Sequence, residues 1–475
     1  MTEARVPCVA CKAPILTGAR KCRDCKAWQV DVSPGRDGSD PGRVSDGGAP
    51  RPGPRMPRAA LIVATAVSTV MAVIISGRES LVGEAPPLTP LVPDPSGVPA
   101  APGPATIGPE AEPEPERPEA VARTYRTREI PIGDGHPLDI VFHPKGQSVY
   151  VSVDDATLRE YRLKNGELLH KATLPAQGDQ IRLLFDRYVA VLRHTDAARI
   201  PVMDTTAWDR DPVLLEVGRG PGDIVELPDG RSVVAATTDG KRVSRFDLPT
   251  GTRLANITLP HATGQLFLVS AEGRPYVAAM GALSHIGRPA GAWIDLFDPN
   301  EASFGATRRS ISVGRDPREG AVTADGTAIF FPDRLSNTAV LLRVAAATEA
   351  KVVPVGQSPE SAFLMGEDRY GITLNSMARS ASVVDLSTMK VEATLMLEGA
   401  PRAGVTASDR QTLFIVLGGR EWPPRGRGVA VLAGAPPKVI ASLPTGEGAC
   451  AVAVSKDGAR AAVANYFGRS ITIIE

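Results

Sequence analysis

Four of the five cysteines lie near the N-terminus in two pairs with the same spacing, Cys8-x2-Cys11 and Cys22-x2-Cys25. Two such pairs can place four thiolates around one ion in the tetrahedral arrangement of structural zinc. Because four protein ligands leave no open coordination position, we expect a structural Zn²⁺ ion and no catalytic metal here. The alternative is a pair of disulfide bonds, which the reducing cytoplasm would disfavour if this segment lies there.

The sequence around these cysteines, CVACKAPILTGARKCRDCKAW, resembles the repeat of the small bacterial zinc-ribbon family. It keeps Gly18 and Ala19 of that pattern, whereas the proline and glycine of each cysteine knuckle are replaced. The resemblance implies a metal-stabilised module, since a fold this small depends on its metal for stability. Its basic residues could contact nucleic acid, but we expect a solvated surface or a docking module for a cytoplasmic protein.

Charged residues also recur after loops that begin with glycine and end with proline. These loops lie at 133–137, 218–221, 314–317 and 356–359, with a shortened version at 399–401. The two positions after each proline supply these charged residues: Asp139, Asp223, Arg318, Glu319, Glu360 and Arg402. His136 lies inside the first loop. If the loops converge at a concave mouth, mixed charges there predict a ligand-binding site. The alternative is a network of salt bridges that fills the space.

The other chemistry-bearing residues form no compact catalytic motif. The six histidines make no HxH or HExxH pattern, and the chain has no G-x-S-x-G elbow, phosphate-binding loop or CxxCH haem site. Cys450 lies in the apolar run GACAVAVS, so we expect it to be buried rather than nucleophilic. These patterns favour a protein that is not an enzyme, and we assign no catalytic residue.

The loops belong to a repeat of about 40–50 residues. A short apolar strand ends in a turn such as LPDG at 227–230 or SKDG at 455–458, and a second apolar strand follows. A third strand leads to a polar turn such as FDLPTG, and a fourth ends before the next glycine–proline loop. Four strands at this period are typical of a β-propeller blade.

First strands that start near 138, 180, 223, 265, 320, 361, 403 and 449 give eight blades, with seven as the alternative. The unit at 177–216 is degenerate, and insertions at 282–291 and 419–427 lengthen two others. The final segment ITIIE ends where a third strand should end, and Arg128 to Gly133 supplies the missing fourth. Joining both segments in one blade would close the ring and leave no open sheet edge.

The repeat resembles the bacterial YVTN/YncE-like propellers, most closely at 136–171, 222–260 and 446–475. The shared motifs encode turns and core strands, so the resemblance implies a mainly β propeller fold. Members and relatives of that family range from surfaces that bind proteins or polymers to lactonase-like and redox enzymes. Fold analogy alone does not choose among these activities.

Residues 59–77, AALIVATAVSTVMAVIISG, contain no charged side chain. About 20 apolar residues are needed to cross a bilayer as a helix. Arg51, Arg55 and Arg58 precede the segment, whereas only Arg78 follows closely, so the positive-inside rule predicts a cytoplasmic N-terminus and an exported C-terminal part. A cleaved signal peptide would have a shorter apolar run and a much shorter leader.

Composition supports this division of the chain. Its 475 residues carry 53 basic and 53 acidic side chains, so there is no overall basic excess of the kind that nucleic-acid-binding proteins usually show. Five cysteines are too few for a disulfide-rich scaffold. The 46 glycines and 43 prolines indicate linkers and a fold rich in turns. In polyproline II conformation, the proline-rich segment could extend on the order of 100 Å.

Together these patterns predict a single-pass protein of the bacterial inner membrane. Its expected parts are a zinc ribbon at 1–30, a disordered linker at 31–58, a transmembrane helix at 59–77, a proline-rich acidic stalk at 78–120 and a β-propeller at 121–475. We expect the extracytoplasmic propeller to bind a protein or an envelope polymer. The alternative is an exported lactonase-like or other hydrolase that uses the carboxylates at the mouth.

Overall fold

The computed structural model describes two short N-terminal strands and most of the chain from residue 124 onward. The described residues are 5–7, 14–16 and 124–475, except 193–196, 238–240, 262, 282–292, 301–303, 306, 345–349 and 421–427. In the N-terminal part, β1 (Arg5–Pro7) pairs antiparallel with β2 (Pro14–Leu16). The four zinc-ribbon cysteines, the segment 59–77 and the stalk lie outside the described residues.

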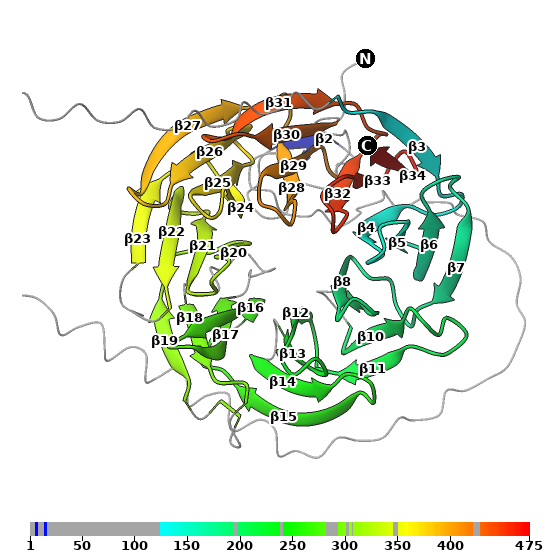
Figure 1. The fold of residues 1–475 in the computed structure, drawn as a ribbon, viewed down its shortest axis with the longest axis horizontal. Coiled ribbons are helices and arrows are strands. Elements are labelled where there is room, and N and C mark those ends of the chain that lie inside the picture. Colours follow the sequence, from blue (N-terminus) through cyan, green and yellow to red (C-terminus); the bar gives the residue numbers. More distant parts are fainter. Residues whose placement is uncertain are drawn as a thin grey trace, which may run out of the picture. The chain divides into compact units, whose positions relative to one another are not determined.

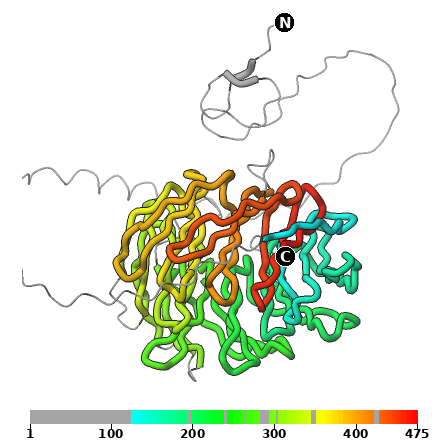
Figure 2. Tube along the Cα trace, turned by 45° about the horizontal axis from the view of Figure 1, so that its top comes forward, coloured from blue at the N-terminus to red at the C-terminus, as the bar shows by residue number. Residues whose placement is uncertain are grey.

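The second part forms eight four-stranded antiparallel sheets that follow one another around a ring (Figure 1). The eight-bladed β-propeller expected from the repeat is therefore confirmed, and the seven-bladed alternative is wrong. The chain passes around the ring in sequence order, from blade to neighbouring blade (Figure 2). The degenerate unit forms a complete blade of four strands.

Each blade contributes its first strand to the inner wall of the ring (Figure 1). These inner strands are β4 (Pro137–Phe142), β8 (Gln180–Leu184), β12 (Pro221–Glu226), β16 (Thr263–Ala271), β20 (Ala321–Val322), β24 (Pro359–Met365), β28 (Pro401–Thr406) and β32 (Ala449–Val454). The second strands are β5 (Ser148–Val153), β9 (Tyr188–Leu192), β13 (Ser232–Thr237), β17 (Arg274–Gly281), β21 (Ala328–Asp333), β25 (Tyr370–Asn375), β29 (Thr412–Leu417) and β33 (Ala461–Asn465).

The outer half of each blade holds the third and fourth strands. The third strands are β6 (Thr157–Arg162), β10 (Arg199–Asp204), β14 (Arg242–Asp247), β18 (Trp293–Phe297), β22 (Thr338–Arg343), β26 (Ser380–Asp385), β30 (Val429–Ala433) and β34 (Ser470–Ile474). The fourth strands are β7 (Leu168–Thr173), β11 (Val213–Glu216), β15 (Thr252–Thr258), β19 (Arg309–Ser312), β23 (Ala350–Pro354), β27 (Lys390–Met396), β31 (Lys438–Leu443) and β3 (Thr127–Pro131).

The core lies between neighbouring blades, where both faces of the middle strands are covered. Every residue of β5, β13, β21, β25 and β29 is buried, which explains why most residues of these strands are apolar. The fourth strands are mostly exposed; β15 and β27 have no buried residue. Sheets that stack through buried faces hold one another in a ring.

The ring closes as the sequence predicts. The segment β3 pairs antiparallel with β34, from Thr127 opposite Ile474 to Pro131 opposite Ser470. Ile130 and Ile471 belong to one apolar cluster together with Tyr161 of the neighbouring blade. The first and last strands of the propeller therefore complete a single blade, which closes the ring of blades.

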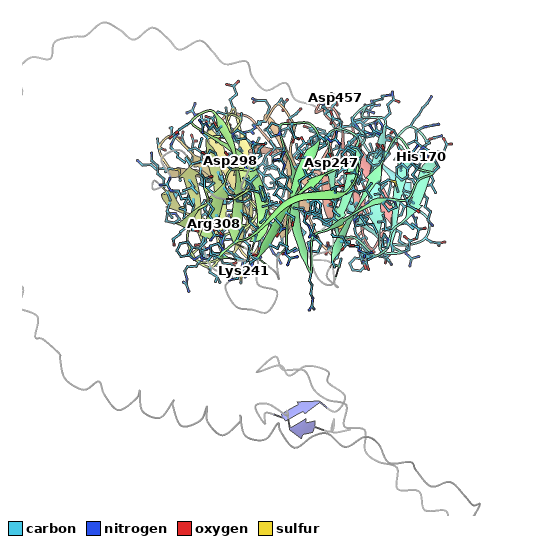
Figure 3. All side chains as sticks on the ribbon, turned by 90° about the horizontal axis from the view of Figure 1, so that it is seen from below. His170, Lys241, Asp247, Asp298, Arg308 and Asp457 are labelled. Carbon is cyan, nitrogen blue, oxygen red and sulfur yellow. The ribbon has the colours of Figure 1, made fainter. Side chains whose placement is uncertain are left out.

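The two faces of the ring carry different turns. The turns between first and second strands lie on one face and those between second and third strands on the other, as Asp457 and Lys241 show in Figure 3. The glycine–proline loops enter the first strands on the same face as Lys241. They therefore converge at one end of the central channel, which we call the mouth. No helix able to cross a membrane is found in the described part of the chain.

Candidate ligand-binding site at the channel mouth

A cavity of about 520 Å³ lies at the mouth, between the starts of the inner strands. Six of the seven residues proposed from the sequence line it: Asp139, Asp223, Arg318, Glu319, Glu360 and Arg402. The seventh, His136, does not line this cavity. Sequence reasoning missed three further charged lining residues, Asp179, Arg182 and Arg420.

Backbone irregularities place the mouth side chains. The register of β4 against β5 shifts between Pro137 and Asp139, and the same shift occurs after Pro221, Pro359 and Pro401. An extra residue in one strand re-aims the side chains beside it, as β-bulges commonly do near functional sites. The repeated proline thus marks a bulge, and the residues that follow it reach the channel.

His136 has a structural position. Its ring stacks on Tyr466 with ring centroids 4.6 Å apart, and its Nδ1 atom lies 2.8 Å from the carbonyl oxygen of that residue. Its backbone N–H donates to Oδ1 of Asp154 at 2.8 Å. These contacts hold the first glycine–proline loop against the last blade and account for His136 without a ligand.

Two of the predicted carboxylates tie one blade to the next. Oδ2 of Asp139 accepts the N–H of Ile181, the second residue of β8, at 2.8 Å. Oδ2 of Asp223 likewise accepts the N–H of Leu266 in β16 at 3.1 Å. In each case Oδ1 accepts the N–H of the next residue along the chain, at 2.9 Å. We call this arrangement the blade latch.

In the two blades that follow Asp223, other acceptor groups make contacts like those of the blade latch. Oε1 of Gln265 accepts the N–H of Gly320 at 3.1 Å. Glu319 uses its backbone oxygen to accept the N–H of Ala362 at 2.8 Å, and its carboxylate accepts the hydroxyl of Ser361 at 3.2 Å. In four of the eight blades, a residue at the start of the inner strand therefore joins this strand to the next inner strand.

Burial changes the ionisation of one latch residue. Removal from water raises the pKa of Asp139 to about 6, against the opposing effects of the Ile181 N–H and of Arg182 and Arg420. Asp223 is 6% exposed, and Nε of Arg182 lies 3.6 Å from its Oδ1. The positive charge of Arg182 is thus placed among the latch carboxylates.

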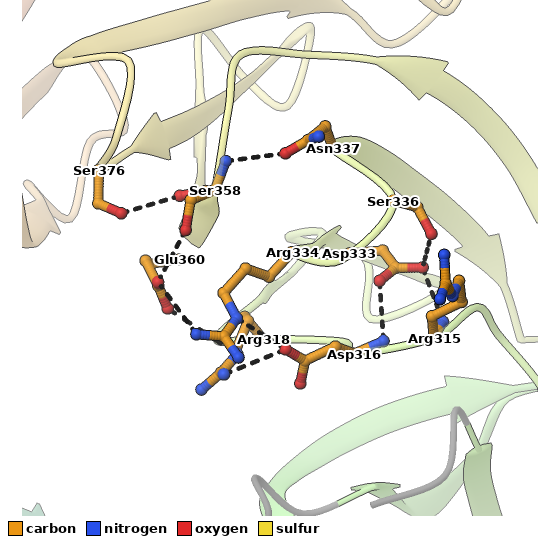
Figure 4. Close-up of polar contacts among 10 residues, drawn as sticks. All are labelled: Arg315, Asp316, Arg318, Asp333, Arg334, Ser336, Asn337, Ser358, Glu360 and Ser376. Atoms are coloured by element: carbon orange, nitrogen blue, oxygen red, sulfur yellow. Dashed lines mark hydrogen bonds and ion pairs between the residues drawn. The ribbon is translucent and has the colours of Figure 1, made fainter. Parts of the chain in front are cut away.

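A second network occupies the mouth beside β20 and β24 (Figure 4). The carboxylate of Asp316 lies 3.1 Å from Arg318 and 2.7 Å from Arg334. Both arginines also lie 3.8 Å from Glu360, which accepts the Ser358 hydroxyl at 3.2 Å. The predicted residues Arg318 and Glu360 are therefore brought together, but in an ion-pair network. The salt-bridge alternative describes this part of the mouth.

Arg402 and Arg420 differ from the other charged residues of the cavity. Both line it and both are exposed. Among the residues that the structure describes, neither side chain has a carboxylate within ion-pair distance. The stem of Arg402 passes Gly419, where an added Cβ would lie 3.9 Å from its Cγ and Cδ atoms. Two guanidinium groups are thus available for a ligand at one side of the mouth.

The one thiol among the described residues that line the cavity is not activated as a nucleophile. Cys450 lines the cavity but is only 9% exposed, and burial raises the pKa of its thiol to about 12. A protonated thiol is a poor nucleophile at neutral pH. Within the described residues no three histidine, cysteine or carboxylate side chains are placed to hold a metal ion.

The missed residues have identifiable sequence contexts. Arg182 is the third residue of the inner strand β8 in the degenerate blade. No glycine–proline loop precedes this strand, so the repeat did not mark Arg182 as a mouth residue. Arg420 stands at the start of the insertion at 419–427, outside the repeat. Alignment of the degenerate unit on its inner strand would have found Arg182, because β8 starts where the repeat predicts.

Comparison with known proteins supports the architecture. The crystal structure of the C-terminal WD40 domain of Sif2 is similar, with 12% identity and a TM-score of 0.57 over 73% of this chain and 97% of that domain. Hydrazine synthase of Kuenenia stuttgartiensis has 15% identity to this chain and a TM-score of 0.48; the match covers 72% of this chain and 96% of the hydrazine synthase chain. No protein-family model and no curated protein sequence matches the chain. The likeness to the WD40 domain is one of fold, and the chain from residue 124 onward is an eight-bladed β-propeller.

Proposed function

We propose that the propeller is a non-catalytic binding module that holds a partner protein or an envelope polymer at its mouth. The observation that carries this proposal is the state of the mouth carboxylates. Asp139 and Asp223 accept backbone N–H groups of the next blade, and Glu360 lies beside two arginines. Groups engaged in this way shape a surface, whereas a hydrolase needs a carboxylate within reach of substrate and water.

The rest of the chain suggests where such binding takes place. We propose that residues 59–77 anchor the protein in the bacterial inner membrane, with the N-terminus in the cytoplasm and the propeller outside it. Residues 1–30 would hold one structural Zn²⁺ through Cys8, Cys11, Cys22 and Cys25 and dock a cytoplasmic protein. The resemblance of the repeat to YVTN/YncE-like propellers is consistent with this proposal, since that group includes binding surfaces.

Site-specific photo-crosslinking of the full-length protein in its native membrane tests the binding role. Gln357 is exposed in a mouth loop, between β23 and β24, whereas Gln411 is exposed in a turn of the opposite face, between β28 and β29. A photoreactive amino acid at position 357 should capture a partner that the same amino acid at position 411 does not capture. Identical products from both positions, or none from position 357, would contradict binding at the mouth.

One observation favours the hydrolase alternative. The pKa of Asp139, raised to about 6 by burial, lies close to the range useful for general acid–base catalysis at neutral pH. If the propeller is a lactonase-like enzyme, Asp139→Asn abolishes hydrolysis of lactone substrates and leaves the melting temperature nearly unchanged. Loss of stability in that variant, without any hydrolysis by the wild type, would assign Asp139 to the latch.

A further inference from the structure

Some arginines of the mouth form ion pairs within the propeller, whereas others do not. Of the described residues that line the cavity, four are arginines and five are carboxylates, so a formal count makes this lining slightly acidic. Arg182 lies beside Asp223, and Arg318 lies between Asp316 and Glu360. The two remaining arginines, Arg402 and Arg420, have no carboxylate at ion-pair distance among the described residues, although Arg420 acts electrostatically on Asp139.

The two available arginines lie on the same blade. Arg402 belongs to the bulge at the start of β28, and Arg420 follows the end of β29, the strand that pairs with β28. Burial raises the pKa of the Cys450 thiol, and the positive charges of Arg420 and Arg402 both lower it in part. Both guanidinium groups therefore act on one region of the cavity wall.

We propose, resting on the binding function above, that Arg402 and Arg420 bind a carboxylate of a partner polypeptide. Arginine presents a planar set of donors that matches a carboxylate in bidentate geometry. A carboxylate held there would give these arginines the anionic partner that Arg182 and Arg318 already have within the propeller.

The other charges of the cavity select the kind of anion. A polymer with a negative charge on every unit, such as a nucleic acid, would meet five carboxylates in the same cavity. A polypeptide can place one acidic group at the arginines and neutral or basic groups elsewhere. The cavity of about 520 Å³ accommodates a few side chains rather than a folded domain. The expected occupant is therefore a loop or terminus of a partner protein.

Fluorescence anisotropy with defined peptides tests the proposal on the full-length protein in detergent. The probe is a peptide of three glycine–glutamate repeats with an acetylated N-terminus, an amidated C-terminus and an uncharged fluorophore. Its counterpart has glutamine in place of glutamate, and a third peptide is the glutamine form with a free C-terminus. Binding of the glutamate peptide would identify side-chain carboxylates, and binding of the third peptide alone would identify a C-terminal carboxylate.

The protein variants are Arg402→Gln and Arg420→Gln, with Arg315→Gln as the matched control. Arg315 is an exposed arginine of another mouth loop and does not line the cavity. Each cavity variant should weaken binding of the carboxylate peptide at least tenfold, as expected for loss of a charge-assisted contact. The control should stay within twofold of the wild type. Thermal denaturation should show no loss of folding, since both side chains are exposed.

Three outcomes would overturn the proposal: no peptide with a carboxylate binds, the amidated glutamine peptide binds equally well, or the cavity variants bind like the wild type. The crosslinking experiment at position 357 separates this failure from failure of the binding function. If a partner is still captured equally by the Arg402→Gln/Arg420→Gln protein, the mouth binds but not through these arginines. If no partner is captured by any form, the binding function itself is contradicted.

Discussion

The carboxylate of Asp223, on β12, accepts the backbone N–H of Leu266, on β16, at 3.1 Å. Asp139 makes the equivalent contact from β4 to Ile181 on β8, at 2.8 Å. In both cases an acidic side chain at the start of one blade satisfies a backbone donor of the next. The mouth carboxylates are thus part of the joint between blades as well as part of the channel surface.

The latch makes a prediction about stability. Asp223→Ala leaves the N–H groups of Ile224 and Leu266 without their side-chain acceptor. Loss of hydrogen bonds to a buried charged group costs about 2–3 kcal/mol. We therefore expect this loss in the free energy of unfolding measured by urea denaturation. Asp134→Ala, at an exposed loop position, is the matched control and should change it by less than about 0.5 kcal/mol. Equal effects of both substitutions would assign no structural role to the latch.

Asp139 should make stability depend on pH. Its pKa of about 6 exceeds the ordinary value of 3.8, so between these values the folded protein binds a proton more strongly than the unfolded chain. The contribution of Asp139 to stability is therefore fully present below about pH 4 and is lost as the pH rises through 6.

Urea denaturation of the wild type and of Asp139→Asn at several pH values between 4 and 7 measures this contribution. Asparagine does not titrate, so the stability of the variant relative to the wild type should improve as the pH rises across this range. The other titrating groups are shared by both proteins. A difference that stays constant from pH 4 to pH 7 would show that Asp139 titrates normally.

Substitutions in β3, the strand that closes the ring, should lower the free energy of unfolding although they lie far from the mouth. Ile130, on β3, is 3% exposed and packs in the cluster that joins the last blade to the first. Ile130→Ala should lower the free energy of unfolding by about 2–5 kcal/mol, because it removes buried surface and leaves a cavity. Leu254→Ala, on the outer strand β15, is the control, since Leu254 is 52% exposed. Similar losses in both variants would contradict a dependence on closure.

The N-terminal cysteines predict one zinc ion per chain. Elemental analysis by mass spectrometry should find about one zinc in the purified full-length protein. Cys8→Ser and Cys22→Ser should each lower this content, because each removes one of four ligands. Cys450→Ser, in the propeller, is the control and should leave it unchanged. Disulfide-linked peptides between these cysteines in protein isolated under non-oxidising conditions would favour the alternative.

The apolar segment at 59–77 predicts membrane attachment. The full-length protein should remain with the membrane fraction after alkaline extraction, whereas a variant lacking residues 59–77 should not. Protease added to intact spheroplasts should reach the propeller, because the arginines before the segment favour a cytoplasmic N-terminus. Recovery of the unaltered protein in the soluble fraction would contradict the anchor.

Most of the fold could be predicted because its signals are local. Turns such as 227–230 and 455–458 fix the ends of neighbouring strands, and the inner strand of the degenerate blade starts at Gln180, as the repeat predicts. Strand order then follows from sequential antiparallel pairing. The closing pair of β3 and β34 was also predictable, since one blade lacked a strand and the propeller began with an extra one.

The site was predicted only in part. The repeat indicates which residues reach the mouth, but their hydrogen-bond partners lie on the neighbouring blade, which a local pattern does not reveal. The repeat places Asp139 and Asp223 at the mouth, but the N–H groups that they accept belong to strands about 40 residues later. His136 has the loop context of a ligand-binding residue, yet it stacks on Tyr466, at the other end of the propeller sequence. Arg420 lies in an insertion for which the repeat makes no prediction.

Ring closure also sets the order of events during synthesis. Ser470 donates to Glu129 although 341 positions separate them in the chain. At about 5–20 residues per second, β3 leaves the ribosome tens of seconds before its partner exists. Until β34 has been synthesised, the nascent propeller cannot close and β3 has no partner strand. An unpaired strand of this kind is prone to aggregate. Synthesis of β34, the last strand of the ring in chain order, therefore determines when β3 can pair and the ring can close.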